Sequence, residues 1–236
     1  MSSTHSVQAI EIEINNHVVF GGINVDTVWA TLVAGAVVII LGLLVARRAT
    51  PGVPSGLQLF WESVVAQVQE QVEQSIGMRV APFAVPIAVT IFVFVLVCNW
   101  LEIIPTHGAL PSPTADVNLT FALALVVIVW VHWFGVKRRG AKEYFGHFFK
   151  PWYLAPINII EEIAKPITLA LRLFGNIFSS AIMLSLIALF PAFLLWLPNA
   201  VYKLFDMAIG VIQAFIFALL TILYFSFAAA SNQEDH

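Results

Sequence analysis

Five long apolar runs constrain the fold of this chain more than any other feature of its sequence. They cover residues 25–46, 82–104, 117–136, 157–190 and 198–230, between charged or Pro/Gly-rich segments. About 20 mostly apolar residues cross about 30 Å of hydrocarbon as a helix, so each run is long enough to span a bilayer. Composition agrees, since only 11% of the 236 residues are charged, against about 25% in soluble domains. The sequence predicts an all-α membrane protein with about five membrane helices.

Residues 56–77 have a different pattern. Apolar residues recur there at helical spacing, while Gln and Glu residues fill the other side. This pattern predicts an amphipathic helix that either lies at the membrane interface or packs on a partner protein.

The last two runs are longer than a straight crossing requires. Each has roughly 33 residues, about 50 Å as a helix, so we expect both to be strongly tilted or to extend beyond the hydrocarbon. Pro191 and Pro198 mark the turn between them. The two runs are therefore predicted to form a tilted helical hairpin.

Lysine and arginine are distributed unevenly among the connecting segments. Residues 1–24, 105–116 and 191–197 contain none, whereas the alternate segments contain Arg47, Arg48, Arg79, Lys137, Arg138, Arg139, Lys142 and Lys150. By the positive-inside rule, tail 1–24 is expected outside and tail 231–236 in the cytoplasm. No secretory or transit signal is recognisable near the N-terminus, which favours a bacterial plasma membrane.

Several classes of function find no support in the sequence. A single cysteine, Cys98, excludes disulfide frameworks, and a net charge of -3 gives no general basic surface for nucleic acid. The chain contains no nucleophile elbow, zinc-protease motif or phosphate-binding loop, and its histidines form no i, i+4 pair. We therefore expect no catalytic residues, no metal and no cofactor in this chain.

Polar residues nevertheless occur inside the hairpin, where each charge costs at least ~2.5–3.5 kcal/mol. On the run 157–190, seven residues at intervals of three or four project from one helical face. This face is called the polar seam, and it consists of Glu161, Lys165, Thr168, Arg172, Asn176, Ser179 and Met183. A matching set on the run 198–230 consists of Lys203, Asp206, Gln213 and Tyr224.

An antiparallel turn near residues 194–195 fixes the expected depths. Asp206 lies level with residue 183, close to Ser179 and Ser180, and Arg172 lies about one turn from Gln213. A membrane arginine often snorkels or locks two helices by a salt bridge. Arg172 is too far from both ends of its run to snorkel easily, and Asp206 is offset by ~16 Å. We therefore expect its partner to come from another chain.

The residues around Arg172 resemble the signature of subunit a of F-type ATP synthases. The resemblance rests on KPITLALRLFGN at 165–176 and on QAFIF with LT at 213–217 and 220–221. Weaker similar segments are NVDT at 24–27, PGVP at 51–54, NWLEIIP at 99–105, PTADVN at 113–118 and PINIIEE at 156–162. The similarity covers most of the chain.

This resemblance implies a noncatalytic, proton-translocating stator subunit. Arg172 would face the essential carboxylate on a rotating ring of c subunits, with Asn176 and Gln213 beside it and one aqueous half-channel reaching it from each side of the membrane. The implied partners are the c ring, b-type peripheral stalk subunits, the rest of the F1F0 complex and lipid. A fixed positive charge suits such a role, because it favours the deprotonated form of a passing carboxylate and opposes direct proton passage.

One position departs from the commonest bacterial pattern. Many family members have a glutamate nine residues after the arginine, paired with a histidine on the last helix, and here these positions are Ala181 and Asp206. We expect Asp206 alone to be the ionisable relay of the outer half-channel.

Further residues are candidates for lining the half-channels, each with a simpler alternative. Glu161 and Glu162 could line the inner half-channel, but carboxylates near a helix start equally often stabilise the helix dipole. Glu102 and Asp116 could form the mouth of the outer half-channel, but charges at such positions are usually solvated. The remaining candidates are Lys165, Thr168, Ser179, Ser180 and Lys203. A self-contained ion channel or a secondary transporter is the alternative function, although no internal repeat of the transporter kind is evident.

Overall fold

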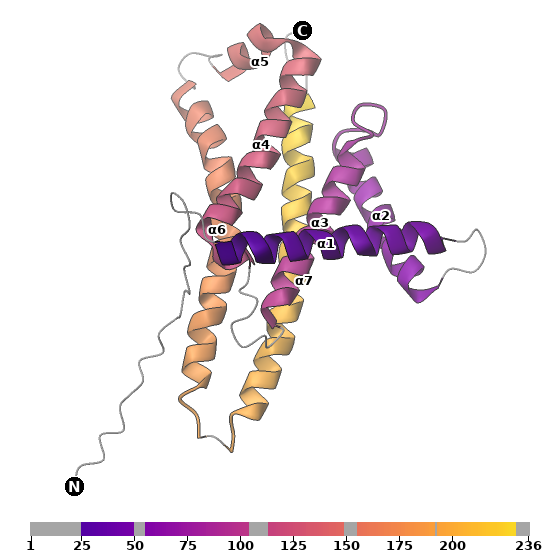
Figure 1. Cartoon of the computed structure of the whole chain (residues 1–236). Coiled ribbons are helices and arrows are strands. Elements are labelled where there is room, and N and C mark those ends of the chain that lie inside the picture. The colour runs from indigo at the N-terminus through magenta and orange to yellow at the C-terminus, as the bar shows by residue number, and fades with distance from the viewer. Residues whose placement is uncertain (1–24, 50–54, 104–112, 149–154, 192, 230–236) are drawn as a thin grey trace.

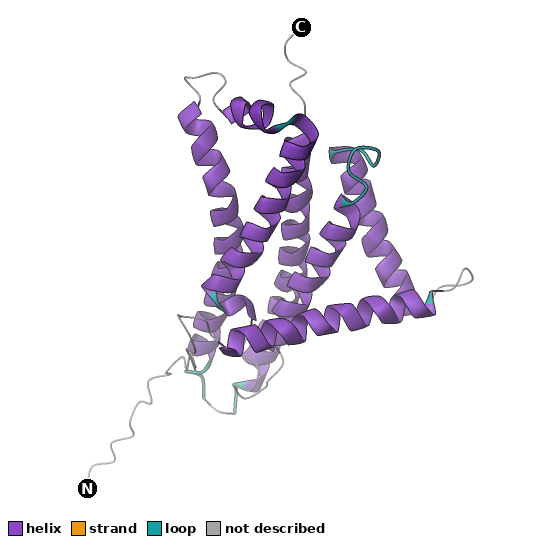
Figure 2. Cartoon of the chain, turned by 45° about the horizontal axis from the view of Figure 1, so that its top comes forward, coloured by secondary structure: helices purple, strands orange, loops and turns teal. Residues whose placement is uncertain are grey.

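The structure, a computed structural model, describes residues 25–49, 55–103, 113–148, 155–191 and 193–229. In these ranges the regular elements are all helices, with no strand (Figure 2). They are α1 (Val25–Arg48), α2 (Gly56–Ser75), α3 (Ala84–Ile103), the short 3-10 helix η1 (Pro113–Ala115), α4 (Val117–Arg139), α5 (Ala141–Phe148), α6 (Ala155–Ile187) and α7 (Trp196–Ala229). Tails 1–24 and 231–236 lie outside the described residues.

Five of these helices, α1, α3, α4, α6 and α7, are long and apolar enough to cross a membrane. The predicted class, an all-α membrane protein whose last two helices are long, is therefore confirmed. α6 has 33 residues and α7 has 34, and Pro166 is accommodated inside α6. The α6 helix ends at Ile187, slightly before the end of its apolar run.

The long hairpin is braced by two other helices. α7 packs mainly against α3 and α6 mainly against α4, and α4 also contacts α7 (Figure 1). Away from their turn, α6 and α7 diverge, and α4 occupies the space between them (Figure 1). The core between the helices includes fully buried Leu169, Leu173, Phe217 and Phe225. In lipid, such contacts stabilise by close packing.

α3 and α7 approach each other closely at Gly210. The Asn99 amide donates a hydrogen bond to the Gly210 carbonyl oxygen at 3.3 Å, and the Trp100 indole donates one to Met207 at 3.4 Å. A Cβ at Gly210 would lie 3.2 Å from the Asn99 Cβ. Any residue with a Cβ at this crossing would therefore crowd the Asn99 side chain, which would have to shift.

α2 uses part of its apolar side within the chain. Val68 and Val72 are buried in the core, and the Ser226 hydroxyl of α7 donates a hydrogen bond to the Ser75 carbonyl oxygen at 2.5 Å. Leu59 and Phe60 remain exposed. Part of the apolar side of α2 thus packs against α3 and α7 of the same chain. The sequence pattern did not identify these two packing partners.

α1 crosses the other long helices instead of running along them (Figures 1 and 2). It contacts α3, and near its start the Thr27 hydroxyl donates a hydrogen bond to Asp116 at 2.9 Å. Length and hydropathy alone do not specify this direction, because they describe one helix and not its neighbours.

We predict that Gly210→Leu destabilises the protein by about 1–3 kcal/mol, since the larger side chain forces α7 away from α3. Thermal unfolding of the detergent-purified protein measures the loss. Gly42→Leu in α1 is the matched control, because a Cβ there meets no atom within 4 Å. Equal melting temperatures for the two variants would contradict the proposed close packing.

Candidate functional site

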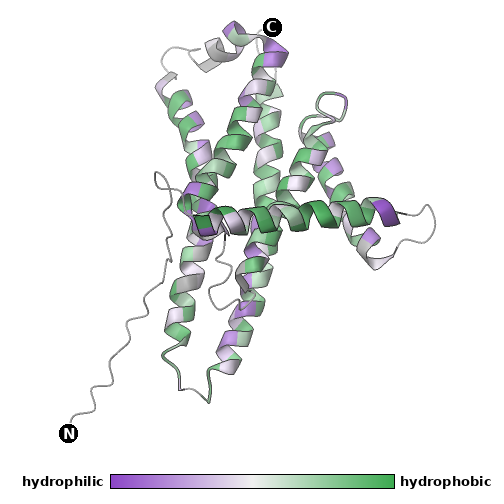
Figure 3. Cartoon of the chain, viewed as in Figure 1, coloured by the Kyte–Doolittle hydropathy of each residue, from purple (hydrophilic) through white to green (hydrophobic). Residues whose placement is uncertain are grey.

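The polar seam lies on the less buried side of α6. Arg172, Glu161, Thr168, Ser179 and Met183 are exposed, and Lys165 and Asn176 are half-buried. On the other side of the helix, Leu169, Ala170 and Leu173 are buried against the bundle. Hydrophilic residues interrupt the otherwise hydrophobic α6 and α7 (Figure 3).

The polar residues of α7 are placed differently. Asp206, Gln213 and Tyr224 are buried and Lys203 is half-buried. The polar residues of the two helices nevertheless meet, Asp206 with Ser180 and Tyr224 with Lys165. Among the described contacts, none joins Arg172 to Asn176 or Gln213.

Asp206 is the buried carboxylate of the hairpin. The Ser180 hydroxyl donates a hydrogen bond to its Oδ2 at 3.3 Å, and both residues are at most 9% exposed. The predicted proximity of Asp206 to Ser180 is confirmed. Lys203 lies one helical turn before Asp206 on the same helix.

Two buried amides near the α3–α7 crossing are incompletely bonded. Gln213 Nε2, a donor, and Asn99 Oδ1, an acceptor, lack hydrogen-bond partners in the described structure. Asn99 contacts α7 at Gly210, one turn before Gln213. An unsatisfied buried polar group costs about 1–3 kcal/mol, so these atoms favour a site that water can reach.

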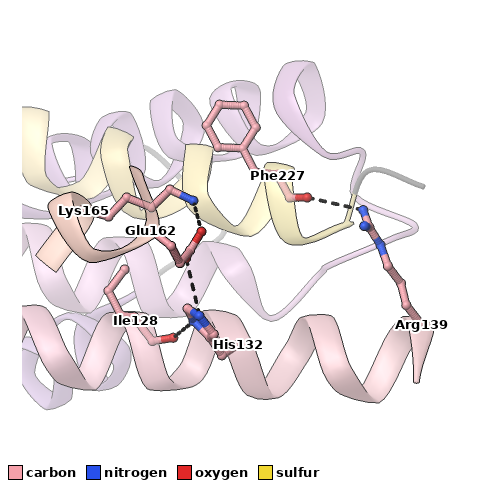
Figure 4. A network of polar contacts seen from close by, with 6 residues as sticks. All are labelled: Ile128, His132, Arg139, Glu162, Lys165 and Phe227. Carbon is pink, nitrogen blue, oxygen red and sulfur yellow. Dashed lines mark hydrogen bonds and ion pairs between the residues drawn. The ribbon is translucent and has the colours of Figure 1, made fainter. Parts of the chain in front are cut away.

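A second polar cluster, here called the inner cluster, consists of His132, Glu162 and Lys165 (Figure 4). Lys165 Nζ lies 2.6 Å from Glu162 Oε2, and His132 Nε2 lies 3.4 Å from Glu162 Oε1. The Lys165 ammonium also lies 5.6 Å from the centroid of the Tyr224 ring, which connects the cluster to α7. At the same end of the bundle, Arg139 donates a hydrogen bond to the Phe227 carbonyl oxygen at 3.3 Å.

The short helix α5 covers the inner cluster. The buried Tyr144 ring packs edge-on against His132, with centroids 5.8 Å apart. Gly135 makes this possible, because a Cβ at that position would overlap the Tyr144 ring. Burial raises the pKa of Tyr144 to about 12, the negative charge of Glu162 adds to the rise, and Arg139 opposes it.

His132 was not among the candidate residues predicted from the sequence. The signal that points to it is an ionisable side chain within a membrane run. Its partner could not be inferred, because Glu162 lies on a helix 30 residues further along the chain. In the described ranges no group of three or more His, Cys, Asp or Glu side chains is arranged to hold a metal.

Asp116 has a structural role. Its carboxylate caps α4 by accepting a hydrogen bond from the backbone N–H of Asn118 at 2.8 Å. It also accepts a hydrogen bond from the Thr27 hydroxyl. Glu102 lies in the last turn of α3, and its side chain is outside the described part of the structure.

These features define a class, a multi-pass α-helical membrane protein with ionisable groups inside its longest helices. Residues 28–226 match the family described as ATP synthase A chain. The sequence is 54% identical over 233 residues to ATP synthase subunit a of Acidothermus cellulolyticus, covering 96% of this chain and 86% of that protein. It is 48% identical over 252 residues to ATP synthase subunit a of Mycobacterium bovis, covering 99% and 100%. For the Coxiella burnetii protein of the same name, identity is 39% over 236 residues, covering 90% and 88%.

The chain therefore belongs to the ATP synthase subunit a family, as its resemblance predicted. It is a multi-pass subunit of the membrane sector, F0, of the F1F0 complex, and it takes part in proton transport and ATP synthesis.

Tyr144 gives the fold a pH dependence. Because the pKa of Tyr144 in the folded protein, about 12, exceeds its ordinary value of 10.0, its contribution to stability is complete below about pH 10 and lost as pH rises towards 12. We expect Tyr144→Phe to remove this part of the alkaline decline in melting temperature. Tyr202→Phe is the matched control and should retain it, so equal declines in the two variants would contradict the assignment to Tyr144.

Proposed function

We propose that this chain is the noncatalytic stator subunit that conducts protons to and from a rotating ring of c subunits. The observation that carries the proposal is the position of Arg172. This arginine is exposed on α6 between two polar clusters. Ser180, which bonds to Asp206, lies about 12 Å from it along the helix, and Glu162 lies about 15 Å away in the other direction.

The surroundings of Arg172 favour a partner from another chain. The guanidinium is permanently charged, and no carboxylate contacts it in the described structure. Leu171 and Phe178 nearby on α6 are each 53% exposed, so an apolar surface is open to a neighbouring helix. A carboxylate on the c ring would supply the opposite charge within this surface.

The electrostatic consequences account for rotary coupling. The Arg172 charge favours release of the proton from an arriving ring carboxylate and opposes a proton hopping directly from one half-channel to the other. A proton must therefore travel with the ring. Each charge that crosses the membrane releases ~2.3 kcal/mol per 100 mV, which drives rotation.

The Ser180–Asp206 pair and the inner cluster lie on opposite sides of Arg172 along α6, as two half-channels require. We assign Asp206 as the relay of the outer one, with Ser180, Ser179, Lys203 and the incompletely bonded Gln213 along its path. Glu161, Glu162, Lys165 and Thr168 line the inner one. Asn176 is half-buried one turn from Arg172 and lies beside the ring-facing surface.

The proposed orientation follows from where the cations gather. Lys137, Arg138 and Arg139 end α4, and Lys142 lies in the adjoining α5, at the end of the bundle where α7 also ends (Figure 1). This end faces the cytoplasm of a bacterial plasma membrane by the positive-inside rule. The N-terminal tail is placed outside, and b-type peripheral stalk subunits complete the stator.

Arg172→Ala should abolish ATP-driven proton pumping in inverted vesicles that contain the whole F1F0 complex, by more than about 100-fold, the scale for losing a preorganised charge. Passive proton flux should change only when the c ring is present. Arg138→Ala removes an exposed arginine at the end of α4 and is the matched control. Pumping that persists in Arg172→Ala would refute the proposal.

Asp206→Ala should reduce pumping by about 100-fold, because a positioned proton-transfer group typically contributes at least that factor. Asp206→Glu should retain most activity, since it keeps an ionisable carboxyl group. The measurement is the pumping rate per assembled complex. An unchanged rate in Asp206→Ala would show that the outer relay lies elsewhere.

A further inference from the structure

We propose that His132 and Glu162 form a proton-exchange site at the inner end of the polar seam, with His132 holding the proton that enters or leaves on the cytoplasmic side. This inference rests on the proposed function and adds a residue of α4 to a pathway otherwise assigned to α6 and α7. It predicts that the inner half-channel passes between α4 and α6.

Hydrogen-bond geometry fixes the tautomer of His132. Its Nδ1 lies 2.8 Å from the carbonyl oxygen of Ile128. A carbonyl oxygen only accepts, so Nδ1 carries a hydrogen. Nε2 then faces Glu162 Oε1 at 3.4 Å. Both of these atoms are acceptors when the imidazole is neutral and the carboxyl group ionised, so the contact is favourable only when one further proton lies between them.

Lys165 decides which of the two residues holds that proton. Its ammonium is 2.6 Å from the other oxygen of Glu162, so the carboxylate is paired with a cation in its ionised form. The exchangeable proton therefore resides on His132 Nε2. When imidazolium transfers it to water, neutral imidazole and hydronium result, and two acceptor atoms then face each other. This repulsion favours capture of the next proton.

The charged and titratable groups around His132 come from four helices. Glu162 and Lys165 approach from α6 and Tyr144 packs on the ring from α5. The ring of Tyr224 of α7 lies near the Lys165 ammonium. Arg139 of α4 points away from His132 and bonds the Phe227 carbonyl oxygen (Figure 4). Glu162 supplies the carboxylate that faces His132 Nε2.

Partial exposure suits exchange with water. The side chains of His132 and Glu162 are 24% and 17% exposed, so the pair is mostly covered but not sealed within the chain. Lys165 belongs both to this cluster and to the polar seam, whose next member is Thr168. A proton moving along the seam therefore arrives within one helical turn of the pair.

The test measures ATP-driven pumping by the whole complex in inverted vesicles, whose outer medium contacts the cytoplasmic face. His132→Gln keeps an N–H donor for Glu162 but cannot exchange a proton. We expect this variant to lose the histidine-dependent part of the pH–rate profile and to pump about 10-fold more slowly near neutral pH. Lys142→Gln removes an exposed cation of α5 and is the matched control.

Coupling between the two residues is tested by Glu162→Gln and the double variant. If they form one site, the double variant is no slower than the worse single variant, because the second substitution removes a function already lost. Multiplying losses would overturn the proposal. A His132→Gln complex with the wild-type pH–rate profile would also overturn it. The same holds if less complex assembles but the profile per assembled complex is unchanged, because His132 would then only hold α4 to α6.

Arg172→Ala, measured in parallel, separates this inference from the proposed function. Loss of pumping in Arg172→Ala with an unchanged His132→Gln profile rejects the proton-exchange site alone. Pumping that survives Arg172→Ala rejects the stator function itself.

Discussion

The cost of an unpaired charge in hydrocarbon is the constraint on which the rest of this structure depends. At ~2.5–3.5 kcal/mol or more for each charged group, such residues persist only where a partner or water compensates them. Glu162 meets that condition with Lys165 and His132, and Asp206 meets it in part through Ser180. Arg172 has no carboxylate partner among the described residues. In the proposed function, a carboxylate of the c ring supplies the opposite charge.

The bracing helices determine how the hairpin is presented. α4 packs against one side of α6 and leaves most of the polar seam exposed, whereas α3 packs closely on α7, most of whose polar residues are buried. The close contact at Gly210 allows the Asn99 amide to reach the α7 backbone. As a result, one helix offers a charged surface to a partner and the other contributes its polar groups to the interior.

Sequence reasoning anticipated the part of this arrangement that depends on a single helix or a single turn. Helical periodicity placed the seam on one face of α6, and the turn position placed Asp206 beside Ser180, as the structure confirms. It did not find His132, because the partner of that residue comes from another helix. α4 packs against both α6 and α7 (Figure 1), and polar residues of the two long helices still meet, Asp206 with Ser180 and Tyr224 with Lys165.

The sequence by itself determined that the chain lies in a membrane, where its helices run and to which family it belongs. The length of the apolar runs, the helical spacing of residues and the motif around Arg172 are all local properties of the chain. Only the tertiary structure decided that α1 crosses the bundle, that Asp116 caps α4, and that Glu162 lies between a lysine and a histidine. These features depend on which helices pack together. In a chain that is apolar almost throughout, many packing arrangements bury similar surface, and steric fit together with the pairing of a few polar groups selects among them.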